Sequence, residues 1–446
     1  MNVDHILTIG FDELTAAQQK RLERQLTFQK DNGDILIAYR KQMLRGYYEV
    51  PRGAWYLLPD SIVYRDNRSC PKMPRLNFTV VLDDIERDPR FEGQSSCVLK
   101  MREEEQGMIV RPPGTGKTQI AMAFAALCQT RTLVIVHTED ILNQWVDYIE
   151  AAIPELQGKV GIIRGRKCEI GHITVATVQT LHKYVKQPDK WWRQWGCLIA
   201  DEAHHVAAPT WEAVINRCPA RYRFGFTASP TRADGMDVAL HFIIGPIIHR
   251  QKFSSPVKLK VVPVKTNFKC VYRGAFDWSH LLDELVSDDE RNLQIADTIG
   301  TEFARGNTVL VLSRRIEHLR SIAELVECPV EILTGQRSRA DRKRILSDFR
   351  SGKLRVLLAT QLADEALDVP RLNRVCLIHP GKHEGRIIQQ VGRAIRKHPD
   401  KQDAIIYDFV DDRMTVLRNQ WRQRKRTYNK EKISVQKIGL RLRRAA

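Results

Sequence analysis

Long apolar runs are missing from this chain of 446 residues: no stretch approaches the ~20 apolar residues that a membrane-spanning helix requires. The first residues also lack the basic segment followed by an apolar segment that is typical of a secretion signal. Nine cysteines are present, but they are scattered, so no Cys-x-x-Cys or Cys/His pairing indicates a zinc or iron–sulfur site. We therefore expect a protein of the cytoplasm, with reduced thiols and no membrane partner.

Acidic residues are outnumbered by basic ones. The chain has 71 Lys and Arg residues, 53 Asp and Glu residues and a net charge of +18, which favours a polyanionic partner. Twelve of the basic residues but only one acidic residue, Glu431, lie within residues 413–446. The alternative interpretation of this segment is a solvated basic tail without a binding role.

Three regions of the chain differ in their sequence pattern. Residues 1–90 combine one polar helix with short strand-like runs. From residue 107 to residue 250, short β-branched runs alternate with longer amphipathic segments, and the same alternation returns between residues 308 and 410. Buried parallel strands that alternate with surface helices produce this pattern. We therefore expect an α/β fold with two tandem parallel-sheet domains that are preceded in the chain by a small α+β N-terminal domain.

The segment "RPPGTGKT", residues 111–118, has the sequence of a phosphate-binding loop between a strand over 107–110 and a helix. Glycines let backbone N–H groups approach phosphates, and the N-terminus of the helix adds its positive end. Lys117 is expected to contact the β- and γ-phosphates, and the Thr118 hydroxyl is expected to bind Mg²⁺. The residues expected to hold the nucleotide here are Gly114, Thr115, Gly116, Lys117 and Thr118.

A second motif, "CLIADEAHH" at residues 197–205, places two adjacent carboxylates at the end of an apolar strand. Carboxylates beside a buried strand are costly unless they serve a cation or a reaction. Asp201 is expected to hold Mg²⁺, directly or through water, and Glu202 to orient and deprotonate an attacking water. The alternative is an acidic helix start in the loop after the strand.

Together, "GTGKT" and "DEAH" resemble the two nucleotide motifs of superfamily 2 helicases, and further segments resemble the remaining motifs in the family's order. These segments are 133–145 and 176–181 for the nucleic-acid backbone, 225–235 for motif III, 310–319 and 332–342 for motif IV and its extension, 358–370 for motif V and 389–396 for motif VI. Within the superfamily, "HFIIGPIIHR" at 241–250 and "VPRG" at 50–53 are similar to the XPB-like branch of bacteria and phages. The resemblance is strong from residue 107 to residue 428 and weaker before that.

The resemblance implies a division into four parts. Residues 91–252 and 253–428 would form two RecA-like domains. A small domain at 1–90 would recognise DNA structure, and residues 429–446 would form a basic tail.

The resemblance also implies ATP and Mg²⁺ as cofactors and adds residues to the site. Gln94 is the candidate for reading adenine, Asp368 for touching the ribose, and Gln389 for reading the γ-phosphate or the water. Arg393 and Arg396 would come from the second domain to stabilise the transition state of hydrolysis.

Nucleic acid is expected to run across both domains, with backbone contacts that make binding sensitive to salt. The residues implied to make these contacts are His137, Thr138, Thr180, Arg232, Ser313, Arg314, Thr334, Gly335, Thr360, Arg422, Arg424, Lys425 and Arg426. Trp421 and Tyr428 could add base stacking. The alternative for Trp421 is a helix that packs this side chain on the second domain.

Three departures from the family pattern stand out. Arg111 replaces the first glycine of the phosphate loop, and we expect it to lie away from the nucleotide cradle. Ala366 replaces the usual glycine of motif V. Gln94 follows Gly93, whereas the adenine-reading glutamine of the family usually follows an aromatic residue.

The sequence thus predicts an ATP-dependent DNA helicase or translocase, acting as a monomer, that moves 3′ to 5′ on branched or forked DNA in repair, recombination or replication. DNA and other repair or replication proteins would be its partners. An RNA helicase, an ATP-switched DNA clamp without unwinding, and the motor subunit of a restriction system stay open as alternatives. Within residues 1–90, the exposed-looking residues Arg45, Tyr47, Tyr48 and Arg52 favour DNA-shape selection, and the alternative is a cap on the first domain.

Overall fold

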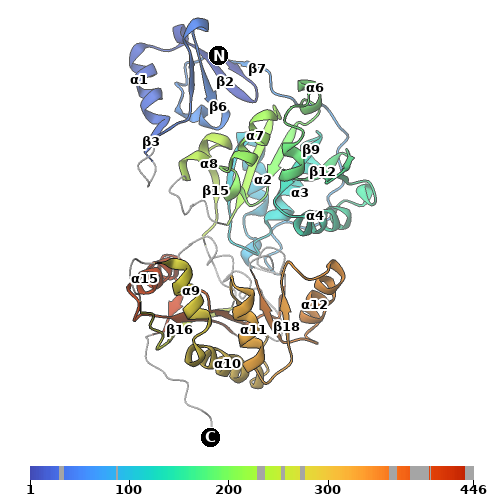
Figure 1. The fold of residues 1–446 in the computed structure, drawn as a ribbon. Coiled ribbons are helices and arrows are strands. Elements are labelled where there is room, and N and C mark those ends of the chain that lie inside the picture. The colour runs from blue at the N-terminus through green and yellow to red at the C-terminus, as the bar shows by residue number, and fades with distance from the viewer. Residues whose placement is uncertain are drawn as a thin grey trace. The chain divides into compact units, whose positions relative to one another are not determined.

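The computed structural model describes residues 1–29, 35–86, 89–228, 237–252, 257–271, 277–360, 369–381, 401 and 403–436 (Figure 1). The chain divides into two compact units, Met1–Lys252 and Phe253–Ala446. In the described part of the chain, no helix has both the length and the apolar character needed to cross a bilayer.

The N-terminal region forms a mostly antiparallel sheet with the strand order β5-β6-β2-β1-β7. Its elements are β1 (Asn2–Val3), β2 (Ile6–Gly10), α1 (Ala16–Gln25), β5 (Arg40–Gln42), β6 (Tyr47–Pro51) and β7 (Arg65–Asp66), with β3 (Thr27–Gln29) and β4 (Ile35–Ile37) as a separate hairpin. Helix α1 begins where Thr15 forms a capping box with Gln18. Leu7, Leu22 and Tyr48 are buried in the core between the sheet and this helix.

This N-terminal region packs tightly on the first wound sheet. Phe242, from that sheet's helical layer, belongs to the N-terminal core. Arg52 is fully buried and donates to the carbonyls of Ala220 and Arg221 at 2.5 Å each. A Cβ on Gly53 would lie 2.3 Å from the Phe242 carbonyl, so only glycine fits this close backbone approach. The expectation that Arg52 and Tyr48 are exposed is therefore wrong, since both are buried.

The connection from the N-terminal region also belongs to the first unit's packing. Ser69 pairs with Ala220 in an isolated parallel bridge, and the Ser69 N–H donates to the Pro219 carbonyl at 2.7 Å. Leu76 lies in the core of the wound sheet. Side chains that precede residue 90 are thus part of the first wound sheet's own hydrophobic core.

The first wound sheet has the strand order β11-β10-β12-β9-β13-β14-β8-β15, parallel throughout except for β11. Its strands are β8 (Gln106–Val110), β9 (Thr132–Val136), β10 (Gly161–Arg164), β11 (Lys167–Glu169), β12 (Ile173–Thr177), β13 (Cys197–Ala200), β14 (Tyr222–Thr227) and β15 (Ile247–Arg250). Its helices are α2 (Gln94–Glu104), α3 (Lys117–Leu127), α4 (Glu139–Ala152), α5 (Val178–His182), α6 (Asp189–Trp192), α7 (Pro209–Arg217) and α8 (Asp237–Ile243).

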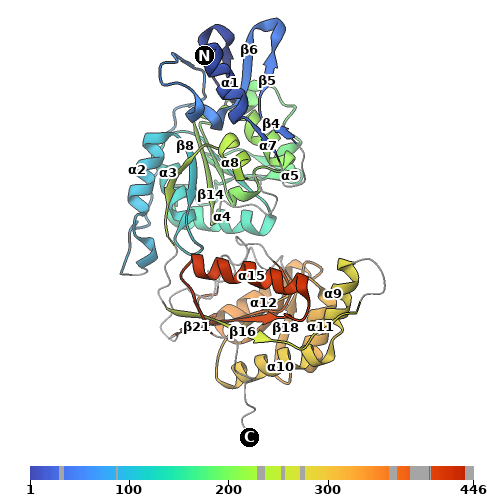
Figure 2. The ribbon, with the colours of Figure 1, turned by 90° about the vertical axis from the view of Figure 1, so that its left-hand side faces the viewer.

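Helices cover both faces of this sheet, because its strands are apolar on both sides (Figures 1 and 2). In β9, Val134 and Val136 pack with α2, α3 and α4, whereas Leu133 and Ile135 pack with α5, α7 and α8. This alternation follows from the two-residue period of a strand.

The second unit is built around a parallel sheet with the order β18-β19-β17-β20-β21-β16-β22. Its strands are β16 (Lys258–Lys265), β17 (Val309–Leu312), β18 (Val330–Leu333), β19 (Val356–Ala359), β20 (Arg374–Leu377), β21 (Asp403–Val410) and β22 (Ser434–Val435). Its helices are α9 (Trp278–Val286), α10 (Asp289–Ala304), α11 (Ile316–Leu325), α12 (Arg339–Ser351) and α15 (Thr415–Lys430). Residues of α10 and α11 pack on one face, and residues of α12 and α15 on the other. The predicted fold class, two parallel-sheet α/β domains behind a small α+β region, is confirmed.

Candidate nucleotide site and nucleic-acid-binding residues

The phosphate-loop segment connects β8 to α3, as expected from the sequence. Gly114 and Gly116 have φ values of +75° and +76°, in the region that favours glycine. Helix α3 begins at Lys117, and its N-cap residue Gly116 has no side chain that could cap the first turn. Lys117 Nζ donates to the Arg111 carbonyl at 3.2 Å. A glycine loop, an uncapped helix start and a lysine together fit a triphosphate.

Gln94 lies against this loop and is completely buried at the start of α2. Its Nε2 donates to the Thr115 carbonyl at 3.2 Å, while its Oε1 accepts from the Asp83 N–H at 3.1 Å. A Cβ on Gly116 would lie 2.0 Å from Gln94 Nε2, so glycine is required there for packing as well as for backbone conformation. Gln94 is therefore not a polar residue of the protein surface.

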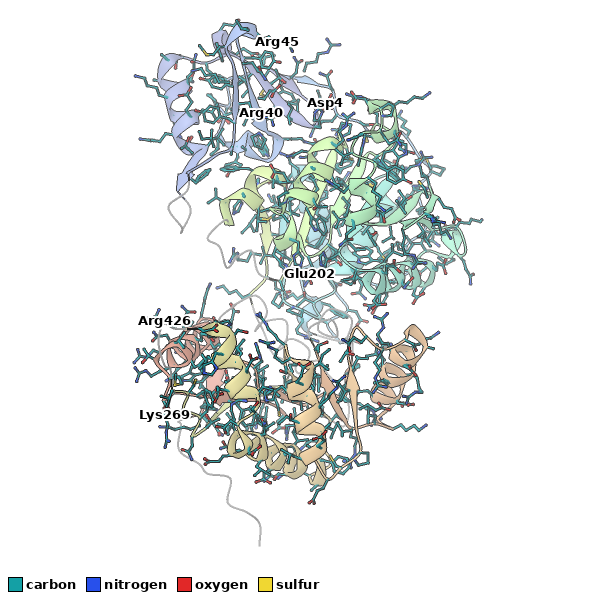
Figure 3. All side chains as sticks on the ribbon, in the orientation of Figure 1. Asp4, Arg40, Arg45, Glu202, Lys269 and Arg426 are labelled. Carbon is teal, nitrogen blue, oxygen red and sulfur yellow. The ribbon has the colours of Figure 1, made fainter. Side chains whose placement is uncertain are left out.

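The two adjacent carboxylates follow β13 at the carboxyl edge of the same sheet, where Figure 3 labels Glu202. Asp201 Oδ2 accepts from the indole N–H of Trp145 at 2.8 Å, and Oδ1 accepts from the Glu202 N–H at 3.0 Å. Glu202 adopts a left-handed backbone conformation with φ +50°. Such strain in a residue other than glycine is unfavourable and is concentrated at functional sites.

The electrostatics of the two carboxylates differ. Burial raises the pKa of Asp201, and the negative charge of Glu202 raises it further. Burial opposes ionisation of Glu202 as well, but a hydrogen bond to His204 and the positive charge of Lys117 hold the pKa of Glu202 below its usual range. Glu202 Oε2 lies 3.3 Å from His204 Nδ1. The pair is therefore arranged so that Glu202 stays an acceptor, while a cation beside Asp201 would favour its ionised form.

Neighbouring histidines join the loops that follow three strands. His137, after β9, stacks on His205 with ring centroids 4.7 Å apart and an interplanar angle of 13°. His204 Nδ1 lies 3.4 Å from the hydroxyl of Thr227, at the end of β14. These contacts link two segments to the carboxylate pair: the one after β9, which is expected to contact nucleic acid, and the motif III segment at the end of β14.

Mg²⁺ is a group that these residues can accept. Thr118 is half-buried at the second position of α3, and Asp201 is the half-buried carboxylate whose ionisation a cation would favour. Among the described residues, no group of three or more His, Cys, Asp or Glu side chains is placed to hold a metal. Mg²⁺ in nucleotide sites needs only one or two protein ligands, because phosphates and waters supply the rest. The donor set therefore fits a nucleotide-bound Mg²⁺.

The residues of the first unit expected to contact nucleic acid differ in availability. Thr138 caps α4, since its hydroxyl accepts from the Ile141 N–H at 3.3 Å. Thr180 is buried, and its hydroxyl bonds Thr177 and accepts from the Gly165 N–H. These two hydroxyls position the loop ends. His137 is half-buried at the same edge of the sheet.

In the second unit, the expected contacts lie just beyond the carboxyl ends of β17, β18 and β19. Ser313 and Thr334 are buried, and the Ser313 hydroxyl lies 3.2 Å from His318 Nδ1. Thr360 is buried as well. Arg314 and Gly335 are exposed. The structure brings all five to one edge of the sheet.

The basic helix α15 has two different faces. Arg422, Lys425 and Arg426 are exposed, and Figure 3 labels Arg426 on this helix. Arg424, in contrast, is buried, and its Nη2 donates to Asp408 Oδ1 at 2.7 Å. The expectation that Arg424 contacts nucleic acid is therefore wrong, because the core already neutralises its guanidinium.

The two aromatic residues of this helix are also internal. Trp421 and Tyr428 lie in the hydrophobic core of the second unit, and the Tyr428 hydroxyl donates to Asp408 Oδ2 at 2.8 Å. Base stacking on these rings is therefore excluded, and the alternative of a helix that packs Trp421 on its own domain is correct.

Five expected site residues lie outside the described residues. They are Asp368, Gln389, Arg393, Arg396 and Arg232. Ala366, the motif V departure, lies outside them too.

Two residues at the nucleotide site were missed or misplaced by sequence reasoning. The sequence places Trp145 at the end of the segment 133–145. A tryptophan on the apolar face of a helix does not predict a hydrogen bond to Asp201. Arg111 was expected away from the cradle, but its Nη2 donates to the Thr115 carbonyl at 3.3 Å. Only the departure from the glycine pattern could have drawn attention to it.

Comparisons with known proteins agree with this site. Residues 78–232 match the family described as "Type III restriction enzyme, res subunit", and residues 291–398 match the "Helicase conserved C-terminal domain". The chain is 29% identical over 368 residues to a protein of Acanthamoeba polyphaga mimivirus whose name describes an ATP-dependent RNA helicase, covering 78% of this chain and 69% of that protein. It is 26% identical over 377 residues to "DNA 3'-5' translocase XPB2" of Sulfurisphaera tokodaii, covering 74% and 83%.

A solved structure supports the fold. S. cerevisiae Dbp5 bound to RNA and ADP BeF3 matches with a TM-score of 0.55 and 13% identity, covering 78% of this chain and 93% of that one. The two family matches, the relatives and the paired nucleotide motifs agree: the chain belongs to the superfamily 2 helicases and is an ATP-dependent helicase of the XPB-like type.

Proposed function

We propose that the protein is a DNA helicase or translocase that moves 3′ to 5′ and acts on forked or branched DNA in repair, recombination or replication. The observation that carries the proposal is the position of the glycine loop before Lys117 and of the carboxylates Asp201 and Glu202, which lie at the same carboxyl edge of the first sheet. The name of the Sulfurisphaera relative supports DNA as the substrate and the 3′ to 5′ direction.

Hydrolysis would use the residues of the first unit in separate roles. Lys117 would neutralise the β- and γ-phosphates. Thr118 and Asp201 would hold Mg²⁺, which would supply positive charge beside the phosphates. Glu202 orients the attacking water and accepts its proton. The Trp145 N–H and the Glu202 backbone N–H occupy one oxygen of Asp201 each, which fixes the direction of its remaining lone pairs.

The second unit would complete the reaction with residues whose roles rest on the family resemblance. Arg393 and Arg396 would stabilise charge in the transition state, Gln389 would read the γ-phosphate or the water, and Asp368 would touch the ribose. An arginine of this kind accelerates comparable phosphoryl transfers by about 10³–10⁵.

For nucleic acid, we propose a path along the carboxyl edges of the sheets. His137 and Arg314 are candidates for backbone contacts, and the exposed Arg422, Lys425 and Arg426 would extend the path. Arg232 would belong to the same set by resemblance. Such contacts are independent of base sequence and sensitive to salt.

We further propose that residues 1–90 select DNA shape through the hairpin of β5 and β6. At the tip of this hairpin, Met43 and Leu44 are 70% and 104% exposed, and Arg45 is exposed beside them, while Arg40 is exposed at the other end of β5 (Figure 3). Apolar side chains flanked by arginines suit a site where base stacking is interrupted, such as a fork. The cap alternative is supported by the buried contacts of Arg52, so both roles are retained.

The test is the ATPase rate of the full chain with forked DNA, single-stranded DNA, duplex DNA and RNA, together with strand displacement on the forked DNA. The proposal predicts that forked DNA stimulates hydrolysis most and is unwound from the 3′ direction. Preferential stimulation by RNA would favour the RNA helicase alternative, which the name of the mimivirus relative supports. Stimulation by DNA without strand displacement would favour an ATP-switched clamp or a motor subunit.

A further inference from the structure

A buried arginine occupies the first position of the phosphate loop, where the family pattern has glycine. Arg111 is completely buried at the end of β8, and its backbone N–H donates to the Thr227 carbonyl at 3.1 Å. Burial lowers the pKa of its guanidinium, but an arginine stays charged in proteins. Burying a charge is unfavourable unless it is paired or hydrogen-bonded, so the contacts of Nη1 and Nη2 must compensate for this cost.

The guanidinium of Arg111 bonds backbone carbonyls from two segments. Nη2 donates to the carbonyls of Arg90 at 3.1 Å and Glu92 at 3.0 Å, and Nη1 donates to that of Gly93 at 3.3 Å. These three residues come directly before Gln94. Nη2 also donates to the carbonyl of Thr115 in the phosphate loop at 3.3 Å. One planar group therefore links the segment before Gln94 to the loop.

The same Thr115 carbonyl accepts from Gln94 Nε2 at 3.2 Å. Arg111 and the side-chain amide of Gln94, which is expected to read the base, thus donate to the same carbonyl oxygen of the phosphate loop. His249 Nε2, on the edge strand β15, lies 3.1 Å from Arg111 Nη1 and braces it from the other side. A displacement of the guanidinium would change the distance between the base-reading amide and the loop.

We propose that Arg111 is a positioning residue that fixes the base-reading segment, residues 90–94, relative to the phosphate loop and thereby sets the affinity and the base preference for the nucleotide. This inference rests on the proposed nucleotide site and adds a residue that touches neither the phosphates nor the base. Replacement by the glycine of the family pattern would remove four hydrogen bonds to backbone carbonyls, two of them buried, so the pattern-restoring change is expected to impair the site.

The test compares Arg111→Gly and Arg111→Lys with the unmodified full chain, without nucleic acid. Binding of ATP, GTP and inorganic triphosphate, each with Mg²⁺, is measured by calorimetry, and unfolding is followed by circular dichroism. Lysine keeps the charge, so it should preserve folding better than glycine does. It cannot bond four carbonyls at once, so the link to the phosphate loop is still lost. Arg52→Ala is the control, because Arg52 is another buried arginine of the same unit that bonds the carbonyls of Ala220 and Arg221 and not the loop.

We expect both Arg111 variants to bind ATP about tenfold more weakly and to discriminate less between ATP and GTP, while inorganic triphosphate, which has no base, loses much less affinity. Arg52→Ala should lower stability without changing these ratios. Equal losses for ATP and triphosphate would reduce Arg111 to general support of the loop, and unchanged ATP binding in a folded variant would overturn the proposal outright. If the unmodified protein binds none of the three ligands, the proposed nucleotide site itself fails, which is a distinct result.

Discussion

Substituting methionine for Arg424 is expected to unfold the second unit more easily without weakening its electrostatic attraction to nucleic acid. Arg424 Nε and Nη2 bond both oxygens of Asp408, at 2.9 and 2.7 Å, and Nη1 donates to the Gly381 carbonyl at 2.8 Å. Methionine would leave Asp408 buried with only the Tyr428 hydroxyl as a donor among these groups. Removing one partner of a buried ion pair costs about 3–5 kcal/mol. This is a large part of the roughly 5–15 kcal/mol by which a domain is stable.

The exposed face of the same helix should behave in the opposite way. Changing Arg422, Lys425 and Arg426 together to glutamine removes three charges without leaving a buried partner unpaired, so the free energy of unfolding should change by no more than about 0.5 kcal/mol per site. If all three contact phosphates of duplex DNA, the slope of log affinity against log salt should flatten by about 2.7, at about 0.9 per contact.

Urea unfolding monitored by circular dichroism measures the first effect, and anisotropy of labelled DNA at several salt concentrations measures the second. The control is the double variant Asp408→Asn with Arg424→Met, in which no unpaired buried charge remains and part of the lost stability should return. A stable Arg424→Met protein with a flattened salt slope would refute the internal role of Arg424. An unchanged slope in the triple variant would make the exposed face a solvated surface.

Three further predictions concern catalysis and substrate choice. Lys117→Ala should abolish nucleotide binding, whereas Glu202→Gln should bind ATP and lose turnover by at least about 10²-fold; normal DNA-stimulated turnover in Glu202→Gln would contradict the role given to this carboxylate. Trp145→Phe removes one donor from Asp201, a charged hydrogen bond of about 1.5 kcal/mol or more, so kcat should fall about tenfold and half-saturation should need more Mg²⁺; an unchanged Mg²⁺ dependence would show that the indole is not needed to orient the carboxylate. Leu44→Ser should leave ATPase on single-stranded DNA intact and reduce the preference for forked over linear DNA, and retention of that preference would remove the hairpin tip from substrate selection.

The local features of the fold and of the nucleotide site could be predicted because each is fixed by a short segment. A strand, a glycine turn and a helix beginning at Lys117 are adjacent in sequence, and a strand such as β9 carries its burial on both faces in four or five apolar residues. Asp201 and Glu202 follow from the end of one buried strand. Their approach to Lys117 follows from parallel pairing, which brings carboxyl ends of strands to one edge.

The errors arose where a side chain serves a partner far away in the chain. The buried residues Leu417, Trp421, Arg424 and Tyr428 follow helical spacing, so the sequence does place Arg424 on the apolar face of α15. The excess of positive charge around it suggested a surface role, and only its bond to Asp408 reveals the internal one. For Arg52 the spacing offered no such sign, because its two carbonyl acceptors lie more than 160 residues away in the chain.

The two hypotheses for residues 1–90, a cap and a selector of DNA shape, make compatible demands on the structure. The hairpin of β5 and β6 is hydrogen-bonded to helix α1, since the Tyr48 hydroxyl and Lys41 Nζ both donate to Glu23, at 2.6 and 2.9 Å. Its tip turns at Gly46, which has φ +69° and leaves Leu44 fully exposed. A rigid base with an apolar tip is what a fork-contacting element needs.

Removing the whole N-terminal region would therefore not separate the two hypotheses. A chain that starts near Asp88 would lose Leu76 from the core of the wound sheet and the Arg52 contacts with the Ala220 and Arg221 carbonyls. Loss of fork preference in such a chain could follow from damage to the first unit alone. Substitution of Leu44 removes nothing from either core. A change in fork preference after this substitution would therefore show that the hairpin tip selects DNA shape, whereas an unchanged fork preference would favour the cap hypothesis.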